Sequence, residues 1–150
     1  MATHQESISA SNILKMLGAS RHDQKGTSSA AYLRSAVRKG LPFSAFETVL
    51  REVDLPQKQL STILGIPTRT IARRKEIRQL TAAESDRLYR VARVAVHAAS
   101  VLGDMDKARA WLKRPNRGLG DEVPLSLLDT DIGARQVEDV LIRLEYGIHG

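Results

Sequence analysis

The 150-residue sequence contains no cysteine, and aromatic residues make up only 4% of it. The absence of cysteine excludes a disulfide framework and any thiolate metal site. No apolar run approaches the roughly 20 residues that a membrane span needs. The first residues also lack the basic and then apolar pattern of a signal peptide. A soluble cytoplasmic protein is therefore the default expectation.

Period-two alternation over the length of a strand is also missing, and nothing repeats with a period of 20 to 50 residues. Apolar residues instead recur every three or four positions in several segments, as they do on amphipathic helices. We therefore expect an all-α protein. Its expected parts are a helix-turn-helix domain, a long helix and a small α-helical C-terminal domain.

The stretch from Gln57 to Lys75 predicts the helix-turn-helix. Gly65 can adopt the positive φ of a tight turn, and Pro67 prevents the first helix from continuing. Thr68 is the expected N-cap of the second helix, in which Ile71 faces inward. The side chains expected to face outward are Arg69, Thr70, Arg73, Arg74 and Lys75.

A short helix with such a basic edge suits the major groove of DNA. The net charge of +6 and the pI near 10 also favour an anionic partner. The competing interpretation is a structural pair of helices without a ligand. Arginine side chains can bind guanine edges, but the sequence does not decide which arginine does so. Threonine hydroxyls and backbone N–H groups at the start of the helix suit phosphates. The predicted DNA-binding residues are Gln57, Lys58, Thr68, Arg69, Thr70, Arg73, Arg74 and Lys75, with Arg78 nearby.

Two capping-box patterns mark expected helix starts. Ser44 with Glu47 precedes one amphipathic segment, and Thr81 with Glu84 precedes a long helix expected from about Ala82 to Leu102. The long helix carries two apolar stripes. One can cover the domain's own core, while the second needs either the C-terminal segment or a second copy of the chain, and we leave both open. Residues 1–7 are expected to be loose.

No catalytic constellation is evident. The four histidines do not have the spacing of metal ligands. We expect His97 to lie at the surface or at the edge of a dimer contact. The acidic pairs Asp121-Glu122 and Glu138-Asp139 fit solvated positions. The glycines at 118 and 120 lack the Gly-Lys-Ser/Thr ending of a phosphate loop. We therefore predict no active site, no metal and no cofactor.

Charge is divided unevenly along the chain. Residues 118–150 hold seven acidic and two basic residues, a net charge of −5, which leaves +11 for the other 117 residues of a chain whose total is +6. The acidic residues are Asp121, Glu122, Asp129, Asp131, Glu138, Asp139 and Glu145. One part of the chain therefore suits phosphates and the other does not.

The C-terminal segment resembles a known family. The matching positions are Trp111-Leu112, Pro115-Asn116, Leu119-Gly120, Pro124 with Leu127-Leu128-Asp129-Thr130, Gly133 with Val137, and Leu141 with Gly147. On these residues the chain resembles the Xre/MbcA/ParS-like antitoxins, over roughly residues 41–150. The sequence departs from the family pattern at Asp121, where a second glycine often follows the first.

This resemblance implies an antitoxin of a type II toxin–antitoxin system. The expected partner is a RES-domain toxin that degrades NAD, and the expected assembly is a homodimer that forms a higher hetero-oligomer with the toxin. The resemblance also implies autorepression through double-stranded operator DNA. The domains would be an N-terminal helical segment (1–40), a helix-turn-helix and dimerisation region (41–103) and a toxin-binding domain (104–150). The expected toxin-binding residues are Trp111, Tyr146, Gly147, Ile148, His149 and Gly150.

Two other hypotheses remain at this point. The chain would be a stand-alone transcriptional regulator if no toxin gene lies beside its own. Alternatively, a helix-turn-helix that has lost DNA binding would serve only protein assembly. Strong weakening of binding by salt would identify phosphate contacts and would exclude the second of these.

Overall fold

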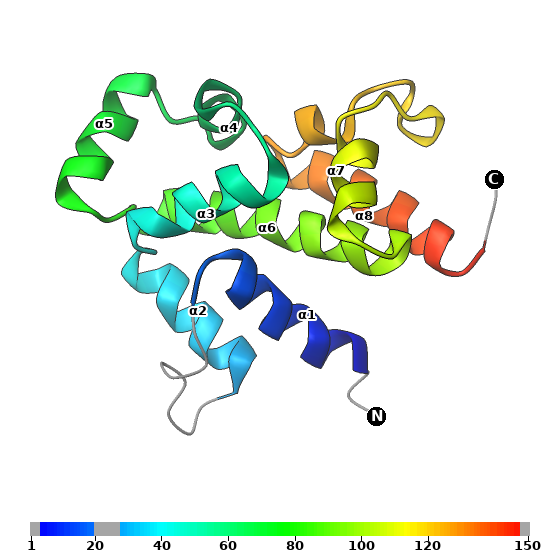
Figure 1. Ribbon diagram of the computed structural model, residues 1–150, viewed down its shortest axis with the longest axis horizontal. Helices are drawn as coiled ribbons and strands as arrows, with labels where there is room; N and C mark the ends of the chain where they lie inside the picture. The colour runs from blue at the N-terminus through cyan, green and yellow to red at the C-terminus, as the bar shows by residue number, and fades with distance from the viewer. Residues whose placement is uncertain (1–3, 20–27, 148–150) are drawn as a thin grey trace.

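The computed structural model describes residues 4–19 and 28–147, with side chains described at 10–19 and 28–147. Within these ranges every regular element is a helix or a 3-10 turn, which confirms the all-α prediction (Figure 1). The elements are α1 (His4–Met16), α2 (Ser29–Lys39), α3 (Phe43–Val53), α4 (Gln57–Leu64), α5 (Thr68–Ile77), α6 (Ala82–Leu102), α7 (Met105–Leu112), η2 (Arg117–Leu119), η3 (Pro124–Leu127) and α8 (Asp131–Glu145).

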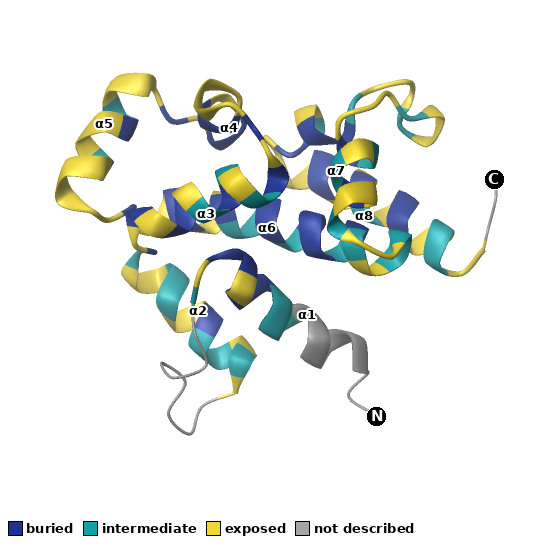
Figure 2. Cartoon of the chain, viewed as in Figure 1, coloured by how far each residue is buried: buried dark blue, intermediate teal, exposed yellow. Residues whose placement is uncertain are grey.

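The long helix α6 is the element around which the others pack. It runs through the middle of the molecule and contacts α1, α2, α7 and α8 (Figure 1). Both of its apolar stripes are covered: Leu88 and Ala92 of one, and Val91 and Val94 of the other, are fully buried (Figure 2). Most of the second stripe therefore packs within the chain, while Ala99, Val101 and Leu102 at the end of α6 are half-buried.

The start of α6 is the capping box that the sequence predicts. The Thr81 hydroxyl accepts from Glu84 N at 3.1 Å, and the Glu84 carboxylate accepts from Thr81 N at 2.9 Å. The prediction of a second capping box at Ser44 is wrong. Helix α3 already begins at Phe43, because Pro42 holds the extended N-cap conformation and its carbonyl accepts from Ala45 N.

The N-terminal helix is longer than expected. We expected residues 1–7 to be loose, whereas α1 begins at His4. Its inner face buries Ile13 and Leu14 in the core, and Leu17, the residue after its end, is buried with them. Helices α1 and α2 pack on each other and on α6, and together they cover the face of α6 opposite to α7 (Figure 1).

Arginines on α6 hold the two halves of the molecule together. Arg87 donates to Leu64 O at the end of α4, and Arg90 donates to Leu128 O after η3. Arg93 binds Glu138 of α8 through its Nε and Nη2 atoms, with a shortest distance of 2.6 Å. Glu138 is therefore half-buried rather than solvated, which corrects the expectation for this carboxylate. Burial opposes the charged form of Arg93, but the hydrogen bond and the charge of Glu138, together with Tyr89, outweigh it and raise the arginine pKa.

Over residues 4–19 and 28–147, no helix combines the length and the apolar character that crossing a membrane requires. Helix α6 has 21 residues, but several charged side chains interrupt it.

Candidate functional site

Helices α4 and α5 form the predicted helix-turn-helix. Gly65 ends α4 in the left-handed conformation, with φ 66° and ψ 29°, as the turn requires. Ile66 plugs the core after the turn, and Ile71 is the only buried residue of α5. The rest of α5 is largely exposed, and the helix stands at one end of the molecule (Figure 2).

Proline, rather than threonine, precedes each helix of this pair. Pro56 and Pro67 occupy the N-cap positions, and Thr68 is the first residue of α5. The prediction of Thr68 as the N-cap is therefore wrong by one position, because the Pro67 carbonyl accepts from Ile71 N. Neither helix of the pair has a side-chain cap. Backbone N–H groups at both helix starts are thus available to an anion.

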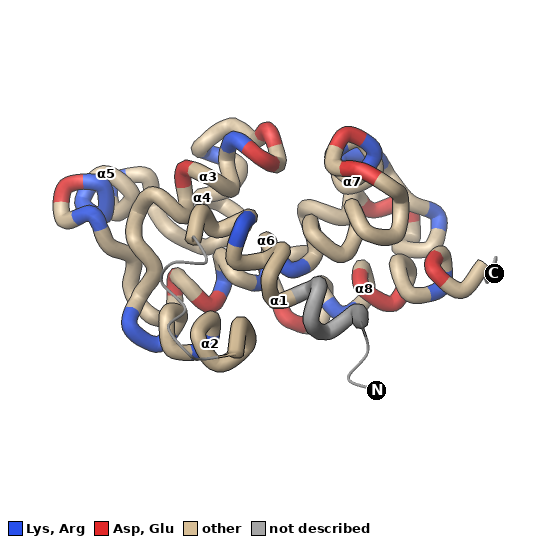
Figure 3. The backbone as a smooth tube through the Cα atoms, turned by 60° about the horizontal axis from the view of Figure 1, so that its bottom comes forward, with Lys and Arg blue, Asp and Glu red and all other residues tan. Residues whose placement is uncertain are grey.

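The exposed face of α5 is basic. Arg69 and Arg73 lie one turn apart, nearly opposite the buried Ile71, and both are exposed. No ion pair to either arginine occurs among the described residues. Figure 3 shows that basic residues predominate on this helix. These two guanidinium groups are therefore the ones that α5 presents outward.

Arg74 does not face outward as expected. Its Nε atom donates to Glu84 Oε1 at 2.8 Å, and the two side chains are 16% and 9% exposed. Burial would raise the pKa of Glu84, but the hydrogen bonds from Arg74 and Thr81 outweigh it and lower this pKa. The same hydrogen bond raises the pKa of Arg74. Arg74 thus ties α5 to the first turn of α6.

The remaining predicted DNA-binding residues flank this face. Gln57 begins α4 and lines, together with Lys75 of α5, a shallow cavity of about 390 Å³ against α3. Lys58 is exposed in the first turn of α4, and Thr70 is half-buried. The structure therefore places Gln57, at the start of α4, near Lys75 in the last turn of α5.

Sequence analysis missed one basic contribution to this surface. The Gln79 amide donates to Lys39 O at 3.0 Å, so the end of α2 lies beside the end of α5. Lys39 and Arg38 form the basic last turn of α2, and Arg78 ends α5 in the left-handed conformation. The sequence shows two adjacent basic residues, Arg38 and Lys39, before Gly40. Only the folded chain places them next to Arg78.

The segment between α7 and α8 is held by its own turns. The Asn116 side chain accepts from Gly118 N, and Asn116 N donates to Glu122 O. Gly120 and Asp121 both adopt left-handed conformations, with φ 65° and 64°. Two consecutive left-handed residues explain why a second glycine would suit this loop, and Asp121 keeps the same shape without it.

The start of α8 allows almost no space at Gly133. A Cβ atom added there would lie 1.9 Å from Leu127 O, and Gly133 N donates to the Thr130 hydroxyl of the N-cap. Leu125 and Leu128 are buried beneath this corner. These residues of the family motif therefore pack and shape the turn before α8, and they are not part of an exposed binding surface.

The exposed C-terminal end offers a different kind of surface. Tyr146 is 67% exposed and Ile142, one turn earlier on α8, is 42% exposed. Gly147 follows in a left-handed conformation. Of the other predicted toxin-binding residues, Trp111 is half-buried and packs against the core, while Ile148, His149 and Gly150 lie outside the described residues.

His97 is half-buried between α6 and α8. Its Nε2 atom is 3.7 Å from Glu145 Oε2 of α8, and both side chains are about one-fifth exposed. Within the described ranges, no group of three or more histidine and acidic side chains is arranged to hold a metal ion. His97 is therefore part of the contact between α6 and α8.

Comparison with known proteins matches both halves of the chain. Residues 33–93 match the antitoxin Xre-like helix-turn-helix domain, and residues 97–147 match the antitoxin Xre/MbcA/ParS C-terminal toxin-binding domain. A protein of Photorhabdus laumondii, named Antitoxin Xre, is 38% identical over 81% of this chain and 84% of its own length. Antitoxin Xre of Yersinia enterocolitica is 33% identical over 77% and 80%. Antitoxin Xre of Pseudomonas putida is 40% identical over 55% and 52%.

Proposed function

The chain belongs to the Xre antitoxin family, and from this premise we propose that it neutralises a RES-type, NAD-degrading toxin and represses its own operon. One observation carries the proposal. The exposed basic helix α5 and the C-terminal end of α8, which closes the acidic segment 118–147, lie at opposite ends of the molecule (Figures 1 and 3). Two such surfaces suit two partners of different charge. We assign 1–40 to an N-terminal helical segment, 41–103 to DNA binding and dimerisation, and 104–150 to toxin binding.

For DNA, Arg69 and Arg73 are the candidates to read guanine edges, because α5 presents both of them outward. Arg74 holds α5 in place through Glu84 and acts on DNA only indirectly. Phosphate contacts supply most of the affinity and carry no sequence information. The residues assigned to phosphates are Gln57, Lys58, Thr68, Thr70 and Lys75.

An inverted-repeat operator would require two copies of the chain. A homodimer would place its two α5 helices about 34 Å apart, one turn of DNA. Because most of both α6 stripes is buried within the chain, the dimer contact proposed here lies mainly outside them. A larger assembly would form when the toxin joins this dimer.

The toxin surface is proposed at the C-terminal end. Tyr146 and Ile142 present apolar area at the end of a segment of net negative charge. A pocket that accepts anionic NAD needs basic groups, and an acidic partner complements them. In this proposal the chain from Tyr146 onward covers that pocket, and Trp111 supports the same domain from within.

A truncation tests the toxin half. We expect a chain ending at Glu145 to lose toxin neutralisation, measured as NAD consumption by the co-expressed neighbouring gene product, while it still binds the DNA upstream of its own gene. The matched control is Arg69→Ala with Arg73→Ala, which should neutralise normally. Full neutralisation by the truncated chain would refute the pocket-covering role.

A regulator without a toxin is the alternative function, and it shares the same basic α5. Co-purification with the product of the neighbouring gene separates the two. A stable complex supports the antitoxin proposal, and an adjacent gene product that neither binds the chain nor degrades NAD supports the stand-alone regulator.

A further inference from the structure

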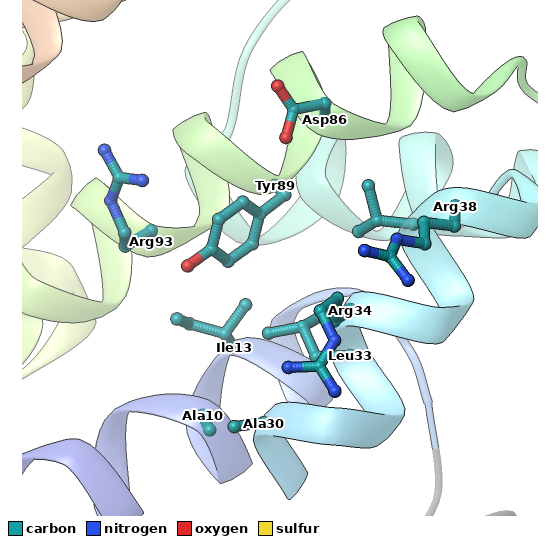
Figure 4. Close-up of a pocket in the computed structure, with 10 residues that line it drawn as sticks. Ala10, Ile13, Ala30, Leu33, Arg34, Arg38, Asp86, Tyr89 and Arg93 are labelled. Atoms are coloured by element: carbon teal, nitrogen blue, oxygen red, sulfur yellow. The ribbon is translucent and has the colours of Figure 1, made fainter.

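A cavity of about 590 Å³ opens between α1, α2 and α6, beside the basic last turn of α2. Its inner wall is apolar. Ile13 of α1 and Leu33 of α2 are both buried residues that line it, together with Ala10 and Val37. Tyr89 of α6 faces Ile13 across the cavity (Figure 4). A volume in this range is typical of small-molecule sites, which are mostly apolar with a few polar groups.

The opening of this cavity carries cationic groups. Arg34 and Arg38 lie one turn apart on α2, are both exposed, and have no ion pair among the described residues. Figure 4 shows both guanidinium groups on the α2 side of the opening. Arg93 is already held by Glu138 and lies over the Tyr89 ring, with its Cζ 5.4 Å from the ring centroid.

One acidic residue also lines the cavity, and its position limits its effect. In Figure 4 the Asp86 carboxylate points away from the apolar wall formed by Ile13 and Leu33. The two arginines of α2 therefore dominate the charge that a molecule entering the cavity meets. An apolar wall below a pair of guanidinium groups fits a molecule with an apolar body and one carboxylate, which guanidinium binds through paired hydrogen bonds.

From this arrangement we propose that the cavity binds a small amphipathic carboxylate, with its apolar body against Ile13, Leu33 and Tyr89 and its carboxylate on Arg34 and Arg38. A second copy of the chain is a poorer occupant. A two-fold contact centred on this opening would bring the same arginines of both copies together, and like charges in an interface are costly.

Such a site is connected to the DNA-binding half through α2. The end of α2 binds the end of α5 through Gln79, and Leu41 N donates to the Ser85 hydroxyl of α6 at 2.7 Å. A ligand that fixes α2 against α6 therefore acts on the same helix that supports α5. The binding site itself does not depend on the identity of the toxin or the operator.

Calorimetry on the full chain tests the proposal, with 2-naphthoate as the probe and its neutral analogue 2-naphthamide as the matched ligand. We expect saturable one-to-one binding of 2-naphthoate, at least about tenfold tighter than that of the amide, because a hydrogen bond to a charged group exceeds a neutral one by about this factor. Arg34→Gln with Arg38→Gln should weaken naphthoate binding by a similar factor. Ala30→Phe should block it by filling the cavity.

The control is Arg143→Gln, an exposed arginine of α8 that lies outside the cavity and should leave binding unchanged. If Ala30→Phe fails to fold, the variant with Arg34→Gln and Arg38→Gln still tests the proposal. Both substituted side chains are exposed, so we expect this variant to fold. No saturable binding of 2-naphthoate up to millimolar concentration would overturn the proposal, as would equal binding of the amide. A change of oligomeric state in the double variant without naphthoate binding would also overturn it and would assign the cavity to a second copy.

Discussion

The Glu84 carboxylate binds two parts of the chain, the start of α6 and helix α5. Its Oε1 atom accepts from Thr81 N at the start of α6 and from Arg74 Nε on α5, and the residue is 7% exposed. Such a shared, buried acceptor is costly to neutralise, because both donors lose a charged partner. The residue that caps α6 is therefore also the residue that fixes the DNA-binding helix.

The lowered pKa of Glu84 makes this contribution dependent on pH. The ionised form is favoured in the folded chain, so its stabilisation is complete above the ordinary glutamate pKa and is lost as the pH falls through the lower, folded value. We expect Glu84→Gln to reduce the free energy of unfolding by about 1–3 kcal/mol at pH 7. The difference from wild type should shrink below about pH 4, as measured by urea unfolding between pH 3 and 7.

The matched control is Glu76→Gln, an exposed carboxylate of α5. It should change stability by only a few tenths of a kcal/mol at either pH. If Glu84→Gln lowered the free energy of unfolding equally at pH 3 and pH 7, the negative charge of Glu84 would not be the source of the stabilisation.

Gly133 shows how a single position forms the corner before α8. Its missing side chain leaves room for Leu127 O, which a Cβ atom would approach to 1.9 Å. We expect Gly133→Ala to lower the free energy of unfolding by about 1–3 kcal/mol or more, since backbone has to move. Thermal melts of Gln136→Ala, an exposed site on the same helix, provide the control. An unchanged melting temperature in Gly133→Ala would show that the corner is pliable.

At the scale of elements, α5 is attached by few side chains. It buries Ile71 alone, its end pairs with the start of α3 through Leu80 N to Leu41 O, and Arg74 binds Glu84. A helix with so few contacts can present most of its surface to DNA. Each of these contacts is then important for holding the helix in position. Arg74 is therefore a positioning residue.

Salt dependence distinguishes a positioning role from a phosphate contact. We expect Arg74→Met to weaken operator binding and leave the slope of log K against log salt unchanged, because no phosphate contact is lost. Lys58→Met should reduce that slope by about 0.9, the value for one phosphate. Fluorescence anisotropy from 50 to 300 mM salt measures both. A slope in Arg74→Met reduced as in Lys58→Met would instead place Arg74 on the DNA backbone.

Elements with strong local signals were predictable from the sequence. The bounds of α6 follow from its capping box and from the Gly103 that ends it, and the helix-turn-helix follows from Gly65 and the apolar spacing. The Arg74–Glu84 pair was missed because a local pattern does not reveal a partner ten residues away across a turn. The covering of the second α6 stripe was likewise undecided, since it depends on where α7 and α8 pack.

At the scale of the whole molecule, α6 belongs to both the DNA-binding half and the toxin-binding half. The two matched domains meet within this one helix, between residues 93 and 97. Arg109 and Lys113 of α7 also donate to the carbonyls of Glu52 and Asp54 at the end of α3. We therefore expect one cooperative unfolding transition for both halves, with the same midpoint by tyrosine fluorescence, tryptophan fluorescence and circular dichroism. Two separated transitions would indicate independent domains.

The central claim is that DNA is bound at α5 and the toxin at the opposite, C-terminal end. The most direct measurement compares two variants in two assays on the same preparations: Arg69→Ala with Arg73→Ala, and the chain ending at Glu145. We expect the double variant to lose operator affinity, by at least about tenfold, and to inhibit the toxin fully. The shortened chain should bind the operator normally and fail to inhibit. Loss of both activities in each folded variant, or the reverse assignment, would contradict the account.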